Sequence, residues 1–112
     1  FLYNAKDHAL EIISESDSRE MLVGETYSFV PPVVLLLVSD VSRFSFGTDE
    51  MRMEWAAIDV GLVAQNILLY CAWKDMAARP RSLMEKEKVN ELLNLSDTQK
   101  ALLNIPISNK TD

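Results

Sequence analysis

The sequence predicts a mixed α/β (α+β) fold in which helices cover a sheet. An uninterrupted aliphatic run at residues 33–38 has the length and the β-branched content of a strand that is covered on both faces. A second apolar stretch, residues 55–73, has the length of a helix. Shorter strand and helix patterns alternate around these two segments, an order typical of helices packed on a sheet.

Composition and charge restrict the classes of protein to which the chain can belong. It has 112 residues, of which 48% are hydrophobic and 25% charged, a balance typical of one globular domain, here residues 1–112. The formal net charge of −6 disfavours nucleic acid and acidic membranes as partners. Because a chain of this length builds a modest core, we expect a homodimer. Cys71 is the only cysteine, and no zinc-site spacing is present.

The first third of the chain predicts a hairpin, a short helix and a strand. Residues 1–3 and 9–13 are apolar segments on either side of a polar turn and predict a β-hairpin. Residues 16–18 supply N-cap candidates for a short helix that ends at Gly24. The aliphatic run 33–38 is then expected to be the central strand of the sheet.

The middle of the chain predicts one long helix. Residues 39–47 are polar and turn-like. Thr48 is a favourable N-cap, and the acidic residues 49–50 complement the dipole of a helix that continues to about Trp73. From Ile58 onward this segment is apolar nearly all round, which indicates a helix buried in a core or an interface. The polar side chains within it favour a soluble buried helix over a membrane span.

The last third predicts two more strands and a surface helix. Residues 76–79 are expected to form a brief strand, and residues 85–95 form a helical pattern with one apolar face. Residues 100–107 are a strand candidate that Pro106 interrupts. The polar tail 108–112 is expected to be loose.

Several residues that often carry chemistry have a structural explanation here. His8 has no defensible catalytic neighbours and is expected on the hairpin surface. Cys71 lies on an apolar helix, where a thiol behaves as a small buried hydrophobe. The polar set Asp59, Gln65 and Asn66 is expected to satisfy buried backbone groups or to make dimer contacts. No side-chain catalyst is predicted, so the catalytic residues stay unknown.

A motif in the long helix resembles a known family. Residues 59–66 read Asp-x-Gly-x-x-x-Gln-Asn, and the surrounding segment 54–72 resembles the central helix of the nitroreductase-like FMN flavoproteins. Three further segments are similar to a small bacterial subgroup related to the oxidoreductases of thiazole- and oxazole-forming peptide maturation. These segments are residues 2–10, 32–35 and 39–40.

The resemblance extends over residues 1–107 and implies the C-terminal portion of such a protein. The family's opening Arg-Ser-x-Arg segment and its Pro-Ser-x-x-Asn-x-Gln segment have no counterpart in the sequence. The chain begins at Phe1 with no initiator Met and no signal-peptide pattern, so we expect a processed or truncated start. A cytoplasmic location is favoured.

The resemblance implies an FMN-dependent oxidoreductase that NAD(P)H reduces and that acts on a nitro compound, a quinone or a similar small-molecule electron acceptor. In that family FMN lies at a two-fold dimer interface. In the family, a backbone segment contacts the reactive edge of the flavin ring. The resemblance implies that Arg81 and Ser82 occupy this position here. Arg79 or Arg81 is suited to pair with the phosphate, because a guanidinium matches phosphate oxygens bidentately.

The sequence departs from the family pattern at several glycines. Asp75 stands where the family usually has Gly, Ser82 and Leu83 stand where one or two Gly follow the Arg, and residues 105–107 replace Gly-Tyr-Pro. Glycine lets a backbone approach a ligand closely, which a side chain hinders. These changes favour the alternative interpretation, a cofactor-free dimerisation or interaction domain derived from the same fold.

Overall fold

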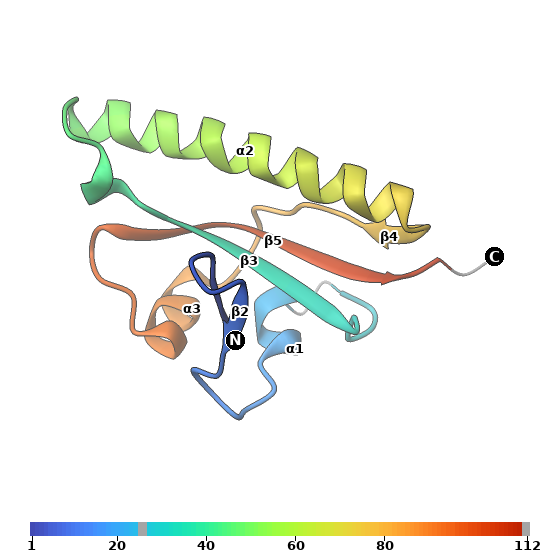
Figure 1. The fold of residues 1–112 in the computed structure, drawn as a ribbon. Helices are drawn as coiled ribbons and strands as arrows, with labels where there is room; N and C mark the ends of the chain where they lie inside the picture. Colours follow the sequence, from blue (N-terminus) through green and yellow to red (C-terminus); the bar gives the residue numbers. More distant parts are fainter. Residues whose placement is uncertain (25–26, 111–112) are drawn as a thin grey trace.

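The computed structural model describes residues 1–24 and 27–110. Its elements are β1 (Leu2–Asn4), β2 (Ala9–Glu11), α1 (Arg19–Val23), β3 (Val33–Asp40), a 3-10 turn (Val41–Arg43), α2 (Asp49–Trp73), β4 (Met76–Ala78), α3 (Lys86–Leu93) and β5 (Gln99–Asn109). Within the described residues, three strands form an antiparallel sheet in the order β3-β5-β4. The helix α2 lies across one face of this sheet (Figure 1). The predicted mixed fold is therefore confirmed.

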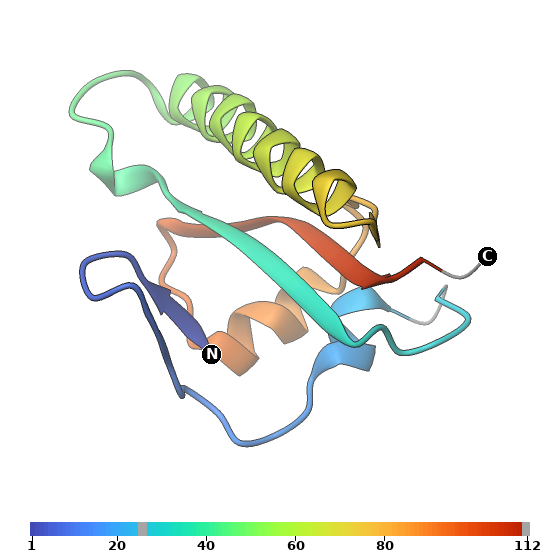
Figure 2. The same cartoon turned by 45° about the vertical axis from the view of Figure 1, so that its right-hand side comes forward.

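The opposite face of the sheet carries the two short helices, α1 and α3, and the β1-β2 hairpin stands beside them (Figure 2). The predicted hairpin and the helix expected within residues 85–95 are both present. The predicted short helix is also present, and it ends at Gly24, whose φ of 76° is one that glycine adopts without a steric penalty. These three predictions are confirmed.

Helix α2 begins and ends where its sequence predicts. The hydroxyl of Thr48 accepts a hydrogen bond from the N–H of Met51 at 3.2 Å, and the acidic residues Asp49 and Glu50 occupy the first turn. The helix ends at Trp73. Asp75, with a φ of 54°, then turns the chain into β4.

Asp75 provides a test of backbone strain, because it holds a left-handed conformation at a position where the sequence resemblance implies glycine. Its carboxylate accepts an ion-paired hydrogen bond from the ammonium of Lys110 at 2.7 Å, but that pair is exposed and contributes little. We expect Asp75→Gly to be about 1 kcal/mol more stable than Asp75→Ala in urea unfolding, since only glycine adopts this φ freely. Lys110→Ala is the control and should change stability by less than about 0.5 kcal/mol. Equal stabilities of the two Asp75 variants would contradict the strain argument.

Burial of α2 is one-sided. Small residues contact the sheet, whereas the opposite side exposes a stripe of large apolar side chains. The buried residues are Ala56, Val60, Ala64 and Cys71. Within the described chain the core therefore buries one side of the segment after Ile58, and burial of its other side in an interface stays a prediction. Cys71 is buried as expected. α2 is long and apolar enough to cross a membrane. The core helices of soluble proteins meet the same criteria of length and composition.

The position of β3 corrects another expectation. β3 is an edge strand, and β5 is the central strand between β3 and β4. The apolar run in β3 reflects cover on both faces, because α2 contacts it from one side and α1 from the other. β3 also continues beyond the predicted end, through Asp40. The apolar content of β3 therefore correctly predicted that helices cover both of its faces, but it did not predict that β3 lies at the edge of the sheet.

Pro106 does not interrupt β5, contrary to expectation. It pairs with Val34 of β3, and its carbonyl accepts a hydrogen bond from the N–H of Arg79 at 3.3 Å. The β4 ladder ends at Ala78 and pairing resumes at Arg81, so the missing N–H of Pro106 lies at a gap in that ladder. A proline is tolerated in the central strand at such a gap.

The expected loose tail is also shorter than predicted. Ser108 and Asn109 pair with β4 as part of β5, and Lys110 forms the ion pair with Asp75. Residues 111–112 lie outside the described residues. The strand extends further because β4 offers backbone partners that the polar composition of the tail does not reveal.

Arg19 attaches α1 to the segment before β3. Its guanidinium binds the carboxylate of Asp17 at 2.6 and 2.9 Å and donates to the carbonyls of Pro31 and Pro32 at 3.1 Å. The hydrogen bonds that the Arg19 side chain and backbone N–H donate to its carboxylate lower the pKa of Asp17 from 3.8 to about 2.

A depressed carboxyl pKa stabilises the folded state above the unfolded pKa, and the contribution is lost as the pH falls through the folded value. We therefore expect the wild type to lose thermal stability between about pH 4 and pH 2 more steeply than Asp17→Asn. Melting curves over this range check it. Identical slopes for the two proteins would show that the Asp17–Arg19 pair does not contribute.

Candidate functional site

A polar cavity of about 460 Å³ brings together two of the predicted site residues. Arg79 and Arg81 follow β4 and line this cavity with Tyr27, Ser28 and Phe29. The two arginines are two residues apart on an extended segment, so their side chains leave the same side of the chain. The aromatic segment was not predicted, because nothing in the sequence distinguishes it from an ordinary loop. The cavity combines cationic, hydroxyl and aromatic groups.

Arg81 is firmly held in this cavity. Its backbone N–H donates to the carbonyl of Asn104 at 2.8 Å, and its carbonyl accepts from the N–H of Asn104 at 2.9 Å. Its guanidinium donates to the carbonyl of Val23 at 2.6 Å and lies 4.6 Å from the ring centroid of Tyr27. The N–H of Arg81, one of the two predicted to reach a flavin, is therefore already paired with protein.

Ser82 and Arg79 keep groups that can bind a ligand. No hydrogen bond within residues 1–24 and 27–110 uses the N–H of Ser82. The exposed side chain of Arg79 likewise has no ion pair or hydrogen bond to the described part of the chain. A guanidinium in this state can pair with an anion without first breaking an internal contact.

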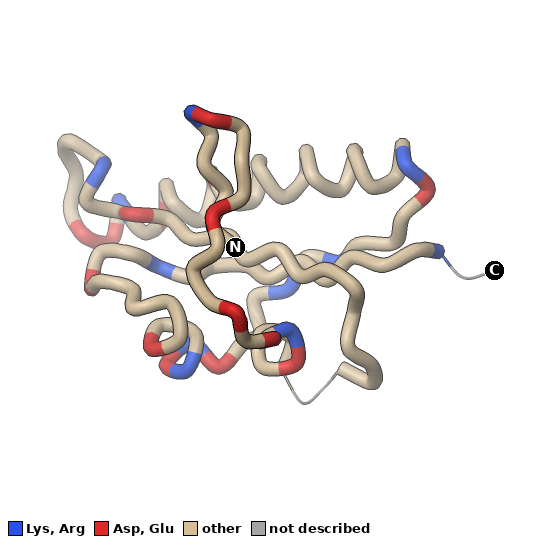
Figure 3. The backbone as a smooth tube through the Cα atoms, turned by 60° about the horizontal axis from the view of Figure 1, so that its bottom comes forward, with Lys and Arg blue, Asp and Glu red and all other residues tan. Residues whose placement is uncertain are grey.

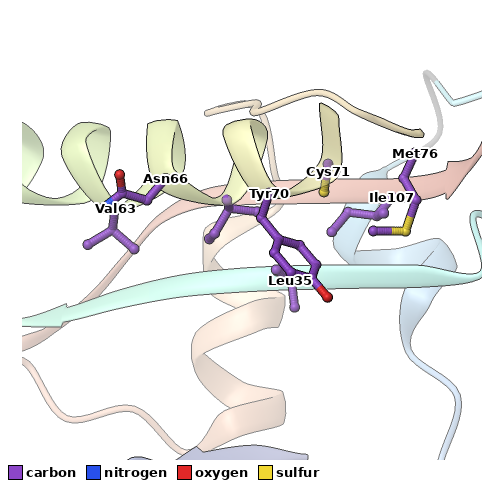
Figure 4. Close-up of a pocket in the computed structure, with 8 residues that line it drawn as sticks. Leu35, Val63, Asn66, Tyr70, Cys71, Met76 and Ile107 are labelled. Atoms are coloured by element: carbon purple, nitrogen blue, oxygen red, sulfur yellow. The ribbon is translucent and has the colours of Figure 1, made fainter. Parts of the chain in front are cut away.

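An apolar groove of about 390 Å³ lies on the other side of β4, between α2 and the sheet (Figure 4). Tyr70 points from α2 toward Leu35 on β3, and Met76 and Ile107 close the end near β4. The residues that line the groove are Leu35, Val63, Asn66, Ile67, Tyr70, Cys71, Met76 and Ile107. Asn66 supplies the one amide among these apolar groups. A groove of this composition suits a flat apolar ring system.

The other candidate residues lie elsewhere. His8 is exposed on the hairpin, as predicted, and its Nδ1 shares a 3.0 Å hydrogen bond with the hydroxyl of Tyr3. Asp59, Gln65 and Asn66 are exposed on α2, so none of them satisfies a buried backbone group; dimer contacts for them stay a prediction. No group of three or more His, Cys, Asp or Glu side chains in the described ranges could hold a metal ion.

These groups can be tested against FMN, the cofactor that the sequence resemblance implies. A flavin mononucleotide needs a cation for its phosphate, N–H donors for the polar edge of its ring, and apolar cover for the ring faces. Within the described residues, Arg79 supplies a guanidinium and Ser82 an N–H that have no partner, whereas the apolar groove beneath α2 shares no lining residue with the cavity of Arg79. Arg79 and Ser82 therefore suit the phosphate and the polar edge of the ring, and Tyr27 and Phe29 are the aromatic groups in the same cavity as Arg79.

Comparison with known proteins assigns the chain to a family. The nitroreductase family model matches residues 4–107. The chain belongs to the nitroreductase family, and the resemblance found in the sequence is confirmed. No curated protein matches the sequence.

Solved structures share the fold. A Ralstonia eutropha JMP134 protein assigned as a nitroreductase matches with a TM-score of 0.87 and 24% identity, over 98% of this chain and 52% of that one. A nitroreductase family protein of Streptococcus pneumoniae TIGR4 matches with a TM-score of 0.65 and 18% identity, over 73% and 56%. A Clostridium acetobutylicum protein assigned as an NADH oxidase matches with a TM-score of 0.61 and 21% identity, over 74% and 49%. The chain spans about half the length of each.

Proposed function

We propose that the chain forms part of an FMN-dependent oxidoreductase that NAD(P)H reduces and that acts on a small-molecule electron acceptor such as a nitro compound or a quinone. The family match supports this class of activity. The observation that carries the proposal is the convergence of Arg79 and Arg81 on one polar cavity, next to the N–H of Ser82, which has no partner within the described chain. These are the three residues that the sequence resemblance assigned to the cofactor.

Each residue has a distinct task in this proposal. Arg79 pairs with the phosphate, since its guanidinium is not engaged within the described chain. The N–H of Ser82 donates to the polar edge of the ring, where a fixed donor stabilises negative charge. The bound flavin would supply the electron transfer. Arg81 orients the loop that carries Ser82, because its backbone and its guanidinium are both held by protein.

The exposed stripe of α2 supports the homodimer in this proposal. Ile58, Leu62, Leu69 and Trp73 recur at intervals of four and seven residues, which places them on one side of the helix, and all four are exposed. No charged residue occurs between Val60 and Trp73 (Figure 3). Packing this stripe against the same stripe of a second copy would remove it from water and would form a two-fold interface.

Flavin binding tests the proposed activity. The purified chain, and the longer protein if the gene encodes one, should quench FMN fluorescence on titration and should show the visible bands of a bound flavin. NADH or NADPH should then bleach those bands. A longer protein that stays colourless and leaves FMN fluorescence unchanged would contradict the proposal.

A cofactor-free dimerisation domain is the second candidate, and one observation favours it. The guanidinium of Arg81 is already engaged with Val23 and Tyr27, and Ser82 and Leu83 carry side chains where the related family has glycine. In this case the protein would dimerise through α2 without taking up FMN. The titration above, combined with a measurement of molecular mass in solution, separates the two candidates.

A further inference from the structure

We propose that Asn104 is a positioning residue that holds the loop of residues 81–83 in the shape that presents the N–H of Ser82. Its effect on a ligand rests on the proposed function, whereas its effect on the loop can be measured without any ligand. Asn104 lies in the middle of β5, between Leu103 and Ile105, in a run of aliphatic residues. No feature of the sequence pattern distinguishes it from an ordinary interruption of that run.

The burial of Asn104 is the first observation. Among the residues that the structure describes, it is the one polar side chain in the buried core, with 0% of its surface exposed. Its Oδ1 atom is buried and has no hydrogen-bond partner there. A buried amide with an unpaired oxygen is unfavourable, and an aliphatic side chain of similar size would avoid this cost. The amide must therefore provide something that a hydrocarbon cannot.

Its hydrogen bonds indicate what it provides. The backbone of Asn104 exchanges hydrogen bonds of 2.8 and 2.9 Å with the backbone of Arg81, and its side-chain Nδ2 donates to the carbonyl of Leu83 at 3.0 Å. One residue thus fixes both ends of a three-residue segment. Ser82 lies between these two fixed points with its N–H unpaired within the described chain.

Packing does not replace these hydrogen bonds. The side chain of Leu83 is 63% exposed, and Ser82 is also exposed. The second anchor of the loop is consequently the Nδ2 hydrogen bond to Leu83. A loop that is ordered before a ligand arrives loses less conformational entropy on binding, so the same bond raises the affinity for a group that Ser82 contacts.

The first measurement uses the ligand-free chain. In ¹⁵N relaxation, the amides of Ser82 and Leu83 should be rigid in the wild type, with order parameters of about 0.85, and should fall to about 0.6 in Asn104→Leu. Ile105→Val is the matched control. Ile105 is also fully buried on β5 but faces the opposite side of the sheet, so this variant is destabilised without losing a bond to the loop.

A second variant keeps the shape of the side chain. Asn104→Asp donates to the carbonyl of Leu83 only when its carboxyl is protonated, and burial raises the pKa of a carboxyl. The loop should therefore be ordered at low pH and should loosen as the pH rises, whereas the wild-type loop should not change. A packing role for Asn104 would not produce this pH dependence. The variant also keeps the test available if Asn104→Leu fails to fold.

FMN titration then connects the loop to the ligand. The dissociation constant should rise about tenfold in Asn104→Leu and should change less than about twofold in Ile105→Val. Unchanged order parameters in both Asn104 variants would overturn the inference, as would a loosened loop with unchanged FMN affinity. If neither this chain nor the longer protein binds FMN, the proposed function fails, while the relaxation data still decide whether Asn104 positions the loop.

Discussion

Leu62→Glu should abolish the proposed α2 dimer and leave a folded monomer. Leu62 lies in the middle of the exposed stripe on α2 and is 64% exposed in a single copy, so a glutamate there is solvated in the monomer. In a two-fold interface the substitution acts twice, and each copy loses about 1.5–3 kcal/mol of apolar burial. We therefore expect the dimer dissociation constant to rise at least about a hundredfold. Sedimentation equilibrium over a range of concentrations measures it.

A matched control is available just after the β1-β2 hairpin. Ile12 is 67% exposed, a value close to that of Leu62, but it lies outside α2. Ile12→Glu should therefore leave the dissociation constant unchanged, and both variants should keep the helical circular dichroism of the wild type. A dimer that persists in Leu62→Glu would place the interface elsewhere. A wild type that is monomeric at all concentrations would remove the dimer from the proposal.

The elements that the sequence predicts well are those that local rules determine. The start of α2 follows from Thr48, whose hydroxyl satisfies a backbone N–H, and from the acidic residues after it. The end of the short helix at Gly24 also follows a local rule, whereas its N-cap residue Ser18 makes no side-chain hydrogen bond to the helix. The strand order β3-β5-β4 has no local cause, because it depends on which distant segments of the chain pair. Pro106 illustrates the difference, since its acceptance in β5 depends on a gap in the β4 ladder.

The candidate site divides in the same way. Arg79, Arg81 and Ser82 were assigned by resemblance to a family motif, and the fold places both arginines in one cavity. Tyr27 reaches that cavity only because the segment before β3 packs beside the end of β4, a long-range contact with no sequence signature. Asn104 was missed because it interrupts an aliphatic run by a single residue. Its importance depends on the hydrogen bond to Leu83, 21 positions away.

Alanine substitutions at the two arginines should separate ligand binding from stability. Arg81→Ala removes a hydrogen bond to the carbonyl of Val23 and a cation–π contact with Tyr27, so it should lower the free energy of unfolding by about 2 kcal/mol. Arg79→Ala removes an exposed side chain with no partner in the described chain and should change stability by less than about 0.5 kcal/mol. Urea unfolding measures both values.

Arg79→Ala, the variant with the smaller effect on stability, should have the larger effect on the affinity for FMN. Arg79→Ala should raise the dissociation constant at least about tenfold, because loss of a charged hydrogen bond to a phosphate costs about 1.5–3 kcal/mol. Arg79→Lys keeps the charge but not the bidentate geometry, so its affinity should lie between those of the wild type and the alanine variant. Riboflavin lacks the phosphate and should bind the wild type and Arg79→Ala equally. If Arg79→Ala weakens riboflavin as much as FMN, Arg79 contacts another part of the flavin. If neither affinity changes, the polar cavity is not the phosphate site.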